Sequence, residues 1–258
     1  MTTTDPLLSA VKFRNRGVQR HFRGVQKHFR NVAERTLHAV TYYTVLRRRG
    51  TRLARVSGFR LTIRPTVYDP RYAVAPPYFA KFIDGLDLAG KRVADIGTGS
   101  GILALAAVRA GAASVVAIDI NPVAAATAAE NARANGAGDR IVTVVSNLFS
   151  AVAPGPHFDV MLINPPFCAG RAWDVADRAW RAGPDYKDIA PLFEQARERL
   201  APGGLAYFII SSASDLHLLG DLIRRAGFSA RLMGRRFILV ESFLLYELRQ
   251  TPVAVPAR

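Results

Sequence analysis

From about residue 91 onward, short apolar runs alternate with polar, glycine-rich or alanine-rich stretches. Five runs of four to six residues have the length and composition of buried strands: 93–96, 115–118, 141–145, 160–163 and 205–210. Alanine-rich stretches at 102–110 and 122–135 lie between the first three runs and have helical composition. Strands that alternate with helices predict βαβ units, and hence a parallel sheet covered on both faces.

The two ends of this region extend the pattern. A short apolar run at 61–65 predicts a strand, and four prolines then lead to a predicted helix at 78–86. Near the end of the chain, 237–240 and 242–248 predict a pair of strands that would close the sheet with an antiparallel edge. We therefore expect an α/β, Rossmann-like doubly wound sheet of seven mostly parallel strands over residues 61–258.

Residues 1–60 differ from this body and predict a basic helical extension. The segment 17–23 (GVQRHFR) is followed at once by 24–30 (GVQKHFR), which gives a seven-residue repeat. Its apolar positions are spaced by four and three, which predicts an amphipathic helix that continues toward residue 46. Two repeats are too few to predict a coiled coil.

The distribution of charge also separates the N-terminal segment from the rest of the chain. Between residues 11 and 60 there are fourteen Lys or Arg and one acid, Glu34, whereas the other 21 basic residues face 19 acids. A local net charge of +13 attracts polyanions, acidic proteins or anionic lipids. The same composition is typical of organelle-targeting segments. A helix that simply packs on the body is the alternative.

Length and composition narrow the class of protein further. A chain of 258 residues fits one α/β domain with a small extension. It has no apolar run of 18 residues, so we expect no membrane span, and it shows no secretory signal. The one cysteine, Cys168, excludes an internal disulfide and a Cys-rich zinc site, and we expect a cytoplasmic protein. The five histidines show no metal-binding spacing.

A glycine-rich loop follows the first strand of the regular pattern. Residues 93–101 (VADIGTGSG) read as strand, loop and helix start, and Gly97, Gly99 and Gly101 let the backbone turn sharply and approach a ligand. The spacing G-x-G-x-G differs from the G-x-G-x-x-G of dinucleotide-binding folds, which argues against a nicotinamide cofactor.

The next two strands end in polar residues. Asp119 ends the second strand, 18 residues after Gly101, where a carboxylate can accept hydrogen bonds from both ribose hydroxyls. It could instead cap the helix that begins at Pro122. After the third strand, Asn147 could lie near an adenine ring or simply occupy a turn.

The fourth strand leads into Asn164, Pro165, Pro166 and Phe167. Together with the glycine loop and Asp119, this motif resembles the class I S-adenosylmethionine-dependent methyltransferases, in particular the Asn-Pro-Pro-aromatic branch that methylates glutamine amides, adenine N6 or guanine N2. The resemblance covers roughly residues 61–249. It implies S-adenosylmethionine as cofactor and cofactor contacts from the following residues: Asp95, Gly97, Thr98, Gly99, Gly101, Asp119, Ile120 and Asn147.

The carboxyl half is also similar to HemK-type glutamine N5-methyltransferases. In that family, the segment that matches 67–70 (VYDP) closes over the cofactor. This chain departs from the family just afterwards, because Arg71, Tyr72 and Ala73 stand where an acidic residue and a threonine are expected. The departure concerns the substrate of that family and leaves the cofactor unaffected.

The chemistry of the motif supports the resemblance independently. The nitrogen of an amide or exocyclic amine is a weak nucleophile because its lone pair is delocalised. The side-chain oxygen of Asn164 and the carbonyl of Pro165 could accept its two N–H bonds, with Pro166 stiffening the loop and Phe167 offering a stacking face. Catalysis would then be mainly orientation and would need no metal.

Three kinds of methyl acceptor remain open from the sequence. The similarity of the carboxyl half favours a protein glutamine side chain. The basic segment 11–60, and a phenylalanine where glutamine enzymes usually have tyrosine, favour an RNA or DNA base. The altered region at Arg71 and Tyr72, and a pocket containing Trp173, would permit a small molecule.

Overall fold

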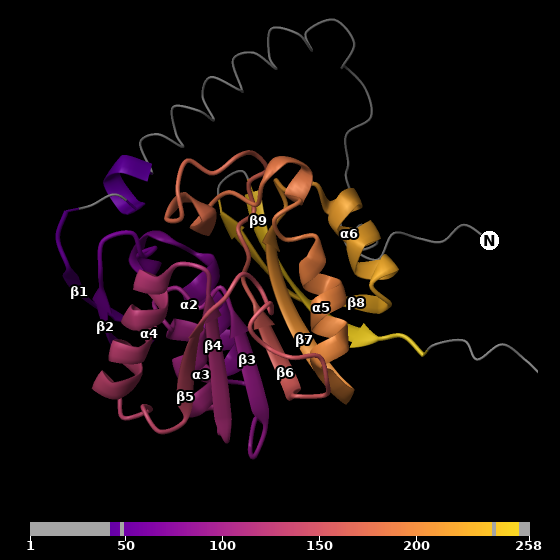
Figure 1. The fold of residues 1–258 in the computed structure, drawn as a ribbon, viewed down its shortest axis with the longest axis horizontal. Coiled ribbons are helices and arrows are strands. Elements are labelled where there is room, and N and C mark those ends of the chain that lie inside the picture. The colour runs from indigo at the N-terminus through magenta and orange to yellow at the C-terminus, as the bar shows by residue number, and fades with distance from the viewer. Residues whose placement is uncertain (1–41, 47–48, 239–240, 253–258) are drawn as a thin grey trace, which may run out of the picture.

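Seven strands form one sheet in the computed structural model, which describes residues 42–46, 49–238 and 241–252 (Figure 1). The order across the sheet is β5-β4-β3-β6-β7-β9-β8. Its strands are β3 (Arg92–Ile96), β4 (Ser114–Asp119), β5 (Ile141–Val145), β6 (Phe158–Ile163), β7 (Leu200–Ser211), β8 (Phe228–Ile238) and β9 (Glu241–Gln250). The first five are parallel, whereas β9 is antiparallel to both β7 and β8. The predicted doubly wound sheet with an antiparallel edge is therefore confirmed.

Helices cover both faces of the sheet, because alternate strand residues point to opposite sides. In β6, Val160 and Leu162 join one core cluster, and Met161 and Ile163 join the other. One face carries α2 (Ala75–Ile83), α3 (Ile102–Arg109) and α4 (Pro122–Ala134). The other face carries α5 (Pro191–Arg199) and α6 (Leu216–Arg225).

A second, two-stranded sheet lies outside the main one. The strands β1 (Arg52–Val56) and β2 (Phe59–Ile63) form an antiparallel hairpin, and β2 packs against α4. The side-chain amide of the fully buried Asn131 of α4 accepts a hydrogen bond from the backbone N–H of Thr62 in the hairpin and donates one to the backbone oxygen of Thr62. The strand predicted at 61–65 thus begins at Phe59, and its partner β1 occupies part of the region for which a helical extension was expected.

The boundary at residue 60, between the proposed extension and the body, stays a prediction. The heptad repeat at 17–30 and most of the basic segment lie outside the described residues. Tyr42–Leu46 forms a short π-helix, η1, and the predicted helix before it lies outside the described residues. Among the residues described, no helix has the length and apolar character that crossing a membrane requires.

Candidate functional site

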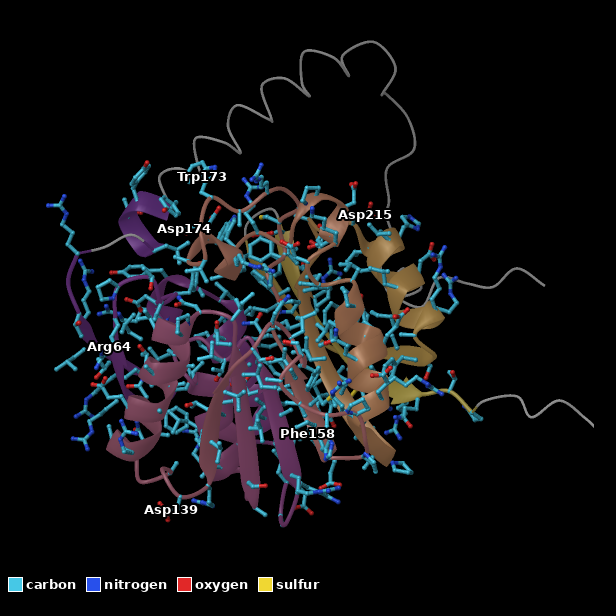
Figure 2. The ribbon with its side chains drawn as sticks, in the orientation of Figure 1. Arg64, Asp139, Phe158, Trp173, Asp174 and Asp215 are labelled. Carbon is cyan, nitrogen blue, oxygen red and sulfur yellow. The ribbon has the colours of Figure 1, made fainter. Side chains whose placement is uncertain are left out.

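A cavity of about 370 Å³ opens at the carboxyl ends of β3, β4 and β6, where parallel sheets of this kind bind ligands. This edge is the upper one in Figure 2, where Asp215, Trp173 and Asp174 are labelled, whereas Asp139 and Phe158 mark the opposite edge. The cavity therefore lies beside the loops that follow the strands, and it extends from the glycine loop to the Asn-Pro-Pro-Phe motif.

The glycine loop leaves room along its wall. Gly97 and Gly99 have φ of +74° and +54°, a region that side chains rarely adopt. A Cβ on Gly99 would meet no atom within 4 Å, and one on Gly97 only the backbone oxygen of Asn164 at 3.9 Å. Both glycines line the cavity, so side chains at these positions would occupy space that a ligand could fill.

Asp95 and Gly101 support this loop without lining the cavity. The fully buried Asp95 accepts hydrogen bonds through Oδ2 from Thr98 Oγ1 (2.7 Å) and the amide of Ala104 (3.1 Å). Burial raises the pKa of Asp95 to about 7, and its Oδ1 has no hydrogen-bond partner in the part of the chain described. Gly101 has φ of +82°, and an added Cβ would meet Ala128 Cβ at 3.1 Å. These two residues shape the loop from behind.

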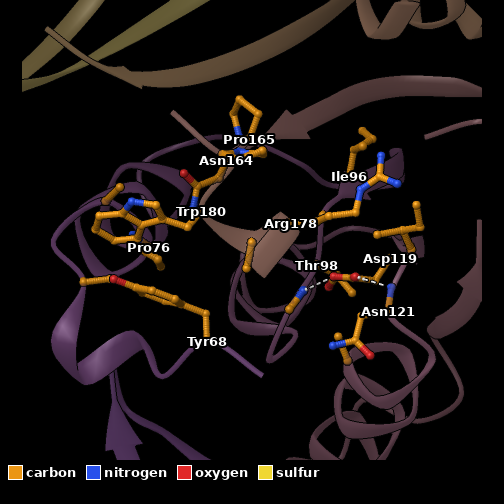
Figure 3. Close-up of a pocket in the computed structure, with 18 of the residues that line it drawn as sticks. Tyr68, Pro76, Ile96, Thr98, Asp119, Asn121, Asn164, Pro165, Arg178 and Trp180 are labelled. Atoms are coloured by element: carbon orange, nitrogen blue, oxygen red, sulfur yellow. Dashed lines mark hydrogen bonds between the residues drawn. The ribbon is translucent and has the colours of Figure 1, made fainter. Parts of the chain in front are cut away.

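Asp119 stands at the tip of β4 and is oriented by the backbone. Its Oδ2 accepts the amide of Gly99 at 2.8 Å, and its Oδ1 accepts the amide of Asn121 at 2.9 Å (Figure 3). Burial raises the pKa of Asp119, while these hydrogen bonds counteract the rise. Asn121, and not Asp119, provides the side chain that caps α4, through Val123 N at 3.0 Å. The carboxylate thus lines the cavity in a fixed orientation.

The Asn-Pro-Pro-Phe motif forms the opposite wall. The backbone oxygen of Phe167 accepts hydrogen bonds from Tyr186 Oη (3.1 Å) and Ser214 Oγ (2.9 Å), which anchors the loop from two other segments. Figure 3 shows Asn164 on the side of Trp180, with Asp119 and Asn121 on the other side. The cavity therefore has an end near Asp119 and an end near Asn164, which we call the cofactor end and the acceptor end.

Aromatic rings from distant segments build the acceptor end, and sequence analysis did not predict this. Trp180 meets Phe167 at 4.9 Å between ring centroids and stacks on Tyr68 at 6.0 Å. Phe243 of β9 meets Phe167 edge-on at 5.8 Å. We call these four rings the aromatic wall; all four line the cavity. A flat group placed against them could make aromatic contact along its face.

The segment before α2 closes the cavity from the hairpin side. Thr66, Val67, Tyr68 and Pro70 line it, and Asn121 Nδ2 donates to the backbone oxygen of Thr66 at 3.0 Å. Burial raises the pKa of Tyr68 to about 12, with smaller contributions from Cys168 and Asp69. Its phenol is therefore neutral at physiological pH.

Arg71, where the sequence departs from the HemK-type family, is engaged with Asp69. Its guanidinium pairs with that buried carboxylate through both nitrogen atoms Nε and Nη2, the shortest distance being 2.7 Å. This pair fixes the turn before α2. It gives Arg71 a local structural role.

The segment between the Asn-Pro-Pro-Phe motif and α5, residues 168–190, lines the acceptor end and contacts η1; we call it the insertion. Tyr42 donates a hydrogen bond to Asp174 Oδ2 at 2.7 Å, and its ring meets Trp173 at 4.9 Å. Figure 2 places Trp173 and Asp174 beside this helix. The insertion also supplies Arg178, which lines the cavity. The last part of the predicted basic segment therefore lies next to the site.

Ten of the twelve predicted site residues line the cavity, and the exceptions are Asp95 and Gly101. Ile120 and Asn147 lie along the cofactor end, and Asn147 is exposed. The roles of these residues stay predictions. Among the described residues, there is no group of three His, Cys, Asp or Glu side chains that could hold a metal ion.

Comparisons with known proteins agree with this architecture. A family model described as ribosomal protein L11 methyltransferase matches residues 80–164. A "Putative protein N5-glutamine methyltransferase" of Methanocaldococcus jannaschii is 28% identical over 195 residues, which cover 74% of this chain and 95% of that protein. The ribosomal protein L11 methyltransferase of Erwinia tasmaniensis is 37% identical over 135 residues, which are 52% of this chain but 40% of that enzyme.

A solved structure shares the fold. The 16S rRNA N2-methyltransferase of T. thermophilus, in complex with S-adenosylmethionine and guanosine, aligns with a TM-score of 0.57 and 20% identity, over 78% of this chain and 50% of that one. The predicted resemblance is thus confirmed at the level of the class. Together, these similarities support a class I S-adenosylmethionine-dependent methyltransferase.

Proposed function

We propose that this protein binds S-adenosylmethionine in the cavity and methylates a planar nitrogen held at Asn164. The single observation that carries the proposal is the juxtaposition, in one cavity, of the open glycine loop with Asp119 and the anchored Asn-Pro-Pro-Phe loop. The residues fit the cofactor, since the cavity wall at Gly97 and Gly99 has the space that a Cβ would fill. The neighbouring 16S rRNA enzyme binds the same cofactor.

Each residue of the cofactor end has a task in this proposal. Asp119, already held by two backbone amides, would accept hydrogen bonds from the ribose hydroxyls. Ile120, Asn147 and Thr98 would surround the adenosine, while Asp95 holds the loop in shape. When bound, S-adenosylmethionine supplies an electrophilic methyl group on a sulfonium, whose carbon–sulfur electron pair returns to sulfur as the methyl leaves.

At the acceptor end the protein orients a weak nucleophile. The Asn164 side-chain oxygen and the Pro165 carbonyl would accept the two N–H bonds, which directs the nitrogen lone pair toward the methyl carbon. The two prolines and the hydrogen bonds to Phe167 keep this loop rigid. After transfer, the nitrogen loses one proton to solvent, so the protein itself needs no strong base.

A protein glutamine amide is the first candidate acceptor. The M. jannaschii relative matches over almost its whole length, and its name specifies glutamine N5 methylation. The amide nitrogen has two N–H bonds, which is the number that Asn164 and Pro165 can accept.

A nucleic-acid base is the second candidate, favoured by the aromatic wall. Four contacting rings offer more stacking area than a glutamine side chain can cover, whereas a base could use it. The segment 11–60, with its net charge of +13, would attract phosphates, and its described end at Tyr42 lies next to the insertion over the acceptor end.

Labelling would test the proposal directly. The purified protein is incubated with radiolabelled S-adenosylmethionine and cell lysate, and label is then followed into protein, RNA and small molecules. We expect label in protein or RNA, and none with Asn164→Ala. A wild-type protein that binds no S-adenosylmethionine by calorimetry would refute the proposal.

A further inference from the structure

Glu241, a half-buried residue, lines the cavity and has no task in the proposed function. Glu241 begins β9 and lines the cavity together with Asn164 and Phe167. Side chains two apart on a strand point to the same face, so Glu241 projects to the side of Phe243. Because the Phe243 ring contacts the Phe167 ring at 5.8 Å, Glu241 belongs to the acceptor end.

Among the described residues, a hydrogen bond reaches one oxygen of this carboxylate. Glu241 Oε2 accepts a hydrogen bond from Ser211 Oγ at 2.5 Å. Ser211 Oγ in turn accepts the amide of Ala213 at 3.0 Å, which leaves its hydroxyl proton for Glu241. No Lys or Arg of the described chain lies within ion-pair distance of Glu241. A carboxylate beside aromatic rings without a cation is costly unless its oxygens accept hydrogen bonds, so Oε1 is suited to a ligand N–H.

We propose that Glu241 determines acceptor specificity by accepting a hydrogen bond from an N–H group next to the reacting amine, and that the acceptor is a guanine base methylated at N2. This inference rests on the proposed function. A carboxylate is an acceptor only, so the group beside the reacting nitrogen must be a donor. Guanine is the one standard base in which a ring N–H, at N1, lies next to an exocyclic amine.

The other acceptors present a lone pair where guanine presents a proton. Adenine has an unprotonated N1 beside its N6 amine, and cytosine has an unprotonated N3 beside its N4 amine. A glutamine amide has its carbonyl oxygen beside the nitrogen, and both of its N–H bonds are already assigned to Asn164 and Pro165. Each of these would bring an acceptor atom against Glu241. The hydrogen bond to the carboxylate would then be lost, and the two acceptor atoms would repel each other. The aromatic wall adds the stacking face that a purine needs.

Fluorescence offers a direct test, because the chain has two tryptophans and one is in the aromatic wall. The Trp173→Phe protein keeps Trp180 as its single tryptophan and serves as the reference. With S-adenosylhomocysteine bound, it is titrated with guanosine, 1-methylguanosine and adenosine, and quenching of Trp180 gives the affinities. We expect guanosine to bind about tenfold tighter than either of the others, since 1-methylguanosine lacks the N1 proton.

Three substitutions in this background distinguish a role in specificity from a general loss of binding. Glu241→Ala should lower guanosine affinity about tenfold and should raise adenosine affinity, because it removes the carboxylate that repels adenine N1. Glu241→Gln should reduce the ratio of guanosine affinity to adenosine affinity, because the glutamine amide can also donate a hydrogen bond to adenine N1. A residue with a purely structural role would not change that ratio. Ser211→Ala keeps the charge and should preserve the order of the three nucleosides.

The opposite results would overturn the inference. Guanosine and 1-methylguanosine would bind equally well, or guanosine would not quench Trp180 at all. Alternatively, the ratio of guanosine affinity to adenosine affinity would stay unchanged in Glu241→Gln. Calorimetry with S-adenosylhomocysteine distinguishes this failure from that of the proposed function. We expect its affinity to be the same in the reference and the Glu241 variants, and a reference protein that does not bind it would refute the proposed function itself.

Discussion

The cofactor end and the acceptor end of the cavity are built in different ways. At the cofactor end, neighbouring stretches of the chain and backbone groups do most of the work. The glycine loop turns at positive φ, and backbone amides of Gly99 and Asn121 orient Asp119. Every residue involved falls between Asp95 and Asn147, in three successive strand–loop units.

The acceptor end depends on side chains that are far apart in sequence. Tyr68, Trp180 and Phe243 reach it from the segment before α2, from the insertion and from β9. None of their ring contacts involves the glycine loop. The difference suggests how one fold keeps a common donor while its acceptors vary, because binding energy for the two partners comes from separable groups.

Removing Asn164 should produce the largest effect and separate the two ends most clearly. We expect Asn164→Ala to lower kcat about a thousandfold, because the acceptor nitrogen loses an anchor that orients it. Its cofactor affinity, measured by calorimetry, should stay within about twofold of wild type. Asn147→Ala removes the same side chain at the cofactor end and should weaken cofactor binding with little change in kcat. If both variants changed the same parameter, the division of the cavity into two ends would be wrong.

The pH dependence of stability should sharpen the account of the cofactor end. The pKa of Asp95 is raised to about 7, so the folded state holds this proton more tightly than the unfolded chain does. Protonated Asp95 therefore stabilises the folded state fully at low pH. As the pH rises from about 4 to about 7, this stabilisation is lost, and the free energy of unfolding falls by up to about 4 kcal/mol. Asp95→Asn should remove this loss, as measured by urea unfolding at several pH values.

Asp159 provides a control of opposite sign. A hydrogen bond from Arg92 lowers the pKa of Asp159, so its contribution is present at neutral pH and is lost as the solution becomes acidic. Asp159→Asn should therefore leave the loss between about pH 4 and pH 7 in place. Identical pH profiles for wild type and Asp95→Asn would contradict the role given to burial at Asp95.

Asp119 tests the ribose assignment, with an intermediate effect. Asp119→Ala removes a carboxylate expected to accept two ribose hydroxyls, so the cofactor Kd should rise about ten- to a hundredfold. Asp159→Ala, which removes a carboxylate at the opposite edge of the sheet, should leave Kd unchanged. Calorimetry with S-adenosylhomocysteine measures both, and an unchanged Kd in Asp119→Ala would remove the ribose assignment.

The sequence predicted the cofactor end well for the same reason that local backbone builds it. Strand, glycine loop and helix follow one another between residues 92 and 109, so spacing alone places Gly97 and Gly99. Apolar periodicity likewise predicted most strands to within a few residues. It missed most of β8, because that edge strand carries exposed polar residues where a buried strand would be apolar.

The acceptor end could not be predicted in this way. Trp180 and Tyr68 lie 112 positions apart, and no local pattern connects them. Glu241 lies between the two apolar runs predicted as the closing strands, and only the pairing of β9 with β7 brings it close to Ser211. The helices α5 and α6 were also not predicted. Contacts of this kind depend on the three-dimensional arrangement, which one sequence does not reveal.

The smallest predicted effect tests whether the glycine loop is held by packing as well as by its turn. Gly101→Ala forces a side chain into φ of +82° and against Ala128 Cβ at 3.1 Å. Gly136 has a similar φ of +69°, but a Cβ there would meet nothing within 4 Å, so Gly136→Ala carries the backbone cost alone. We expect about 1 kcal/mol of destabilisation for Gly136→Ala and about 2–3 kcal/mol for Gly101→Ala, measured by urea unfolding. Because Gly101 belongs to the glycine loop and Gly136 does not, only Gly101→Ala should also weaken cofactor binding. Equal losses of stability in the two variants would show that packing against Ala128 of α4 contributes nothing to the loop.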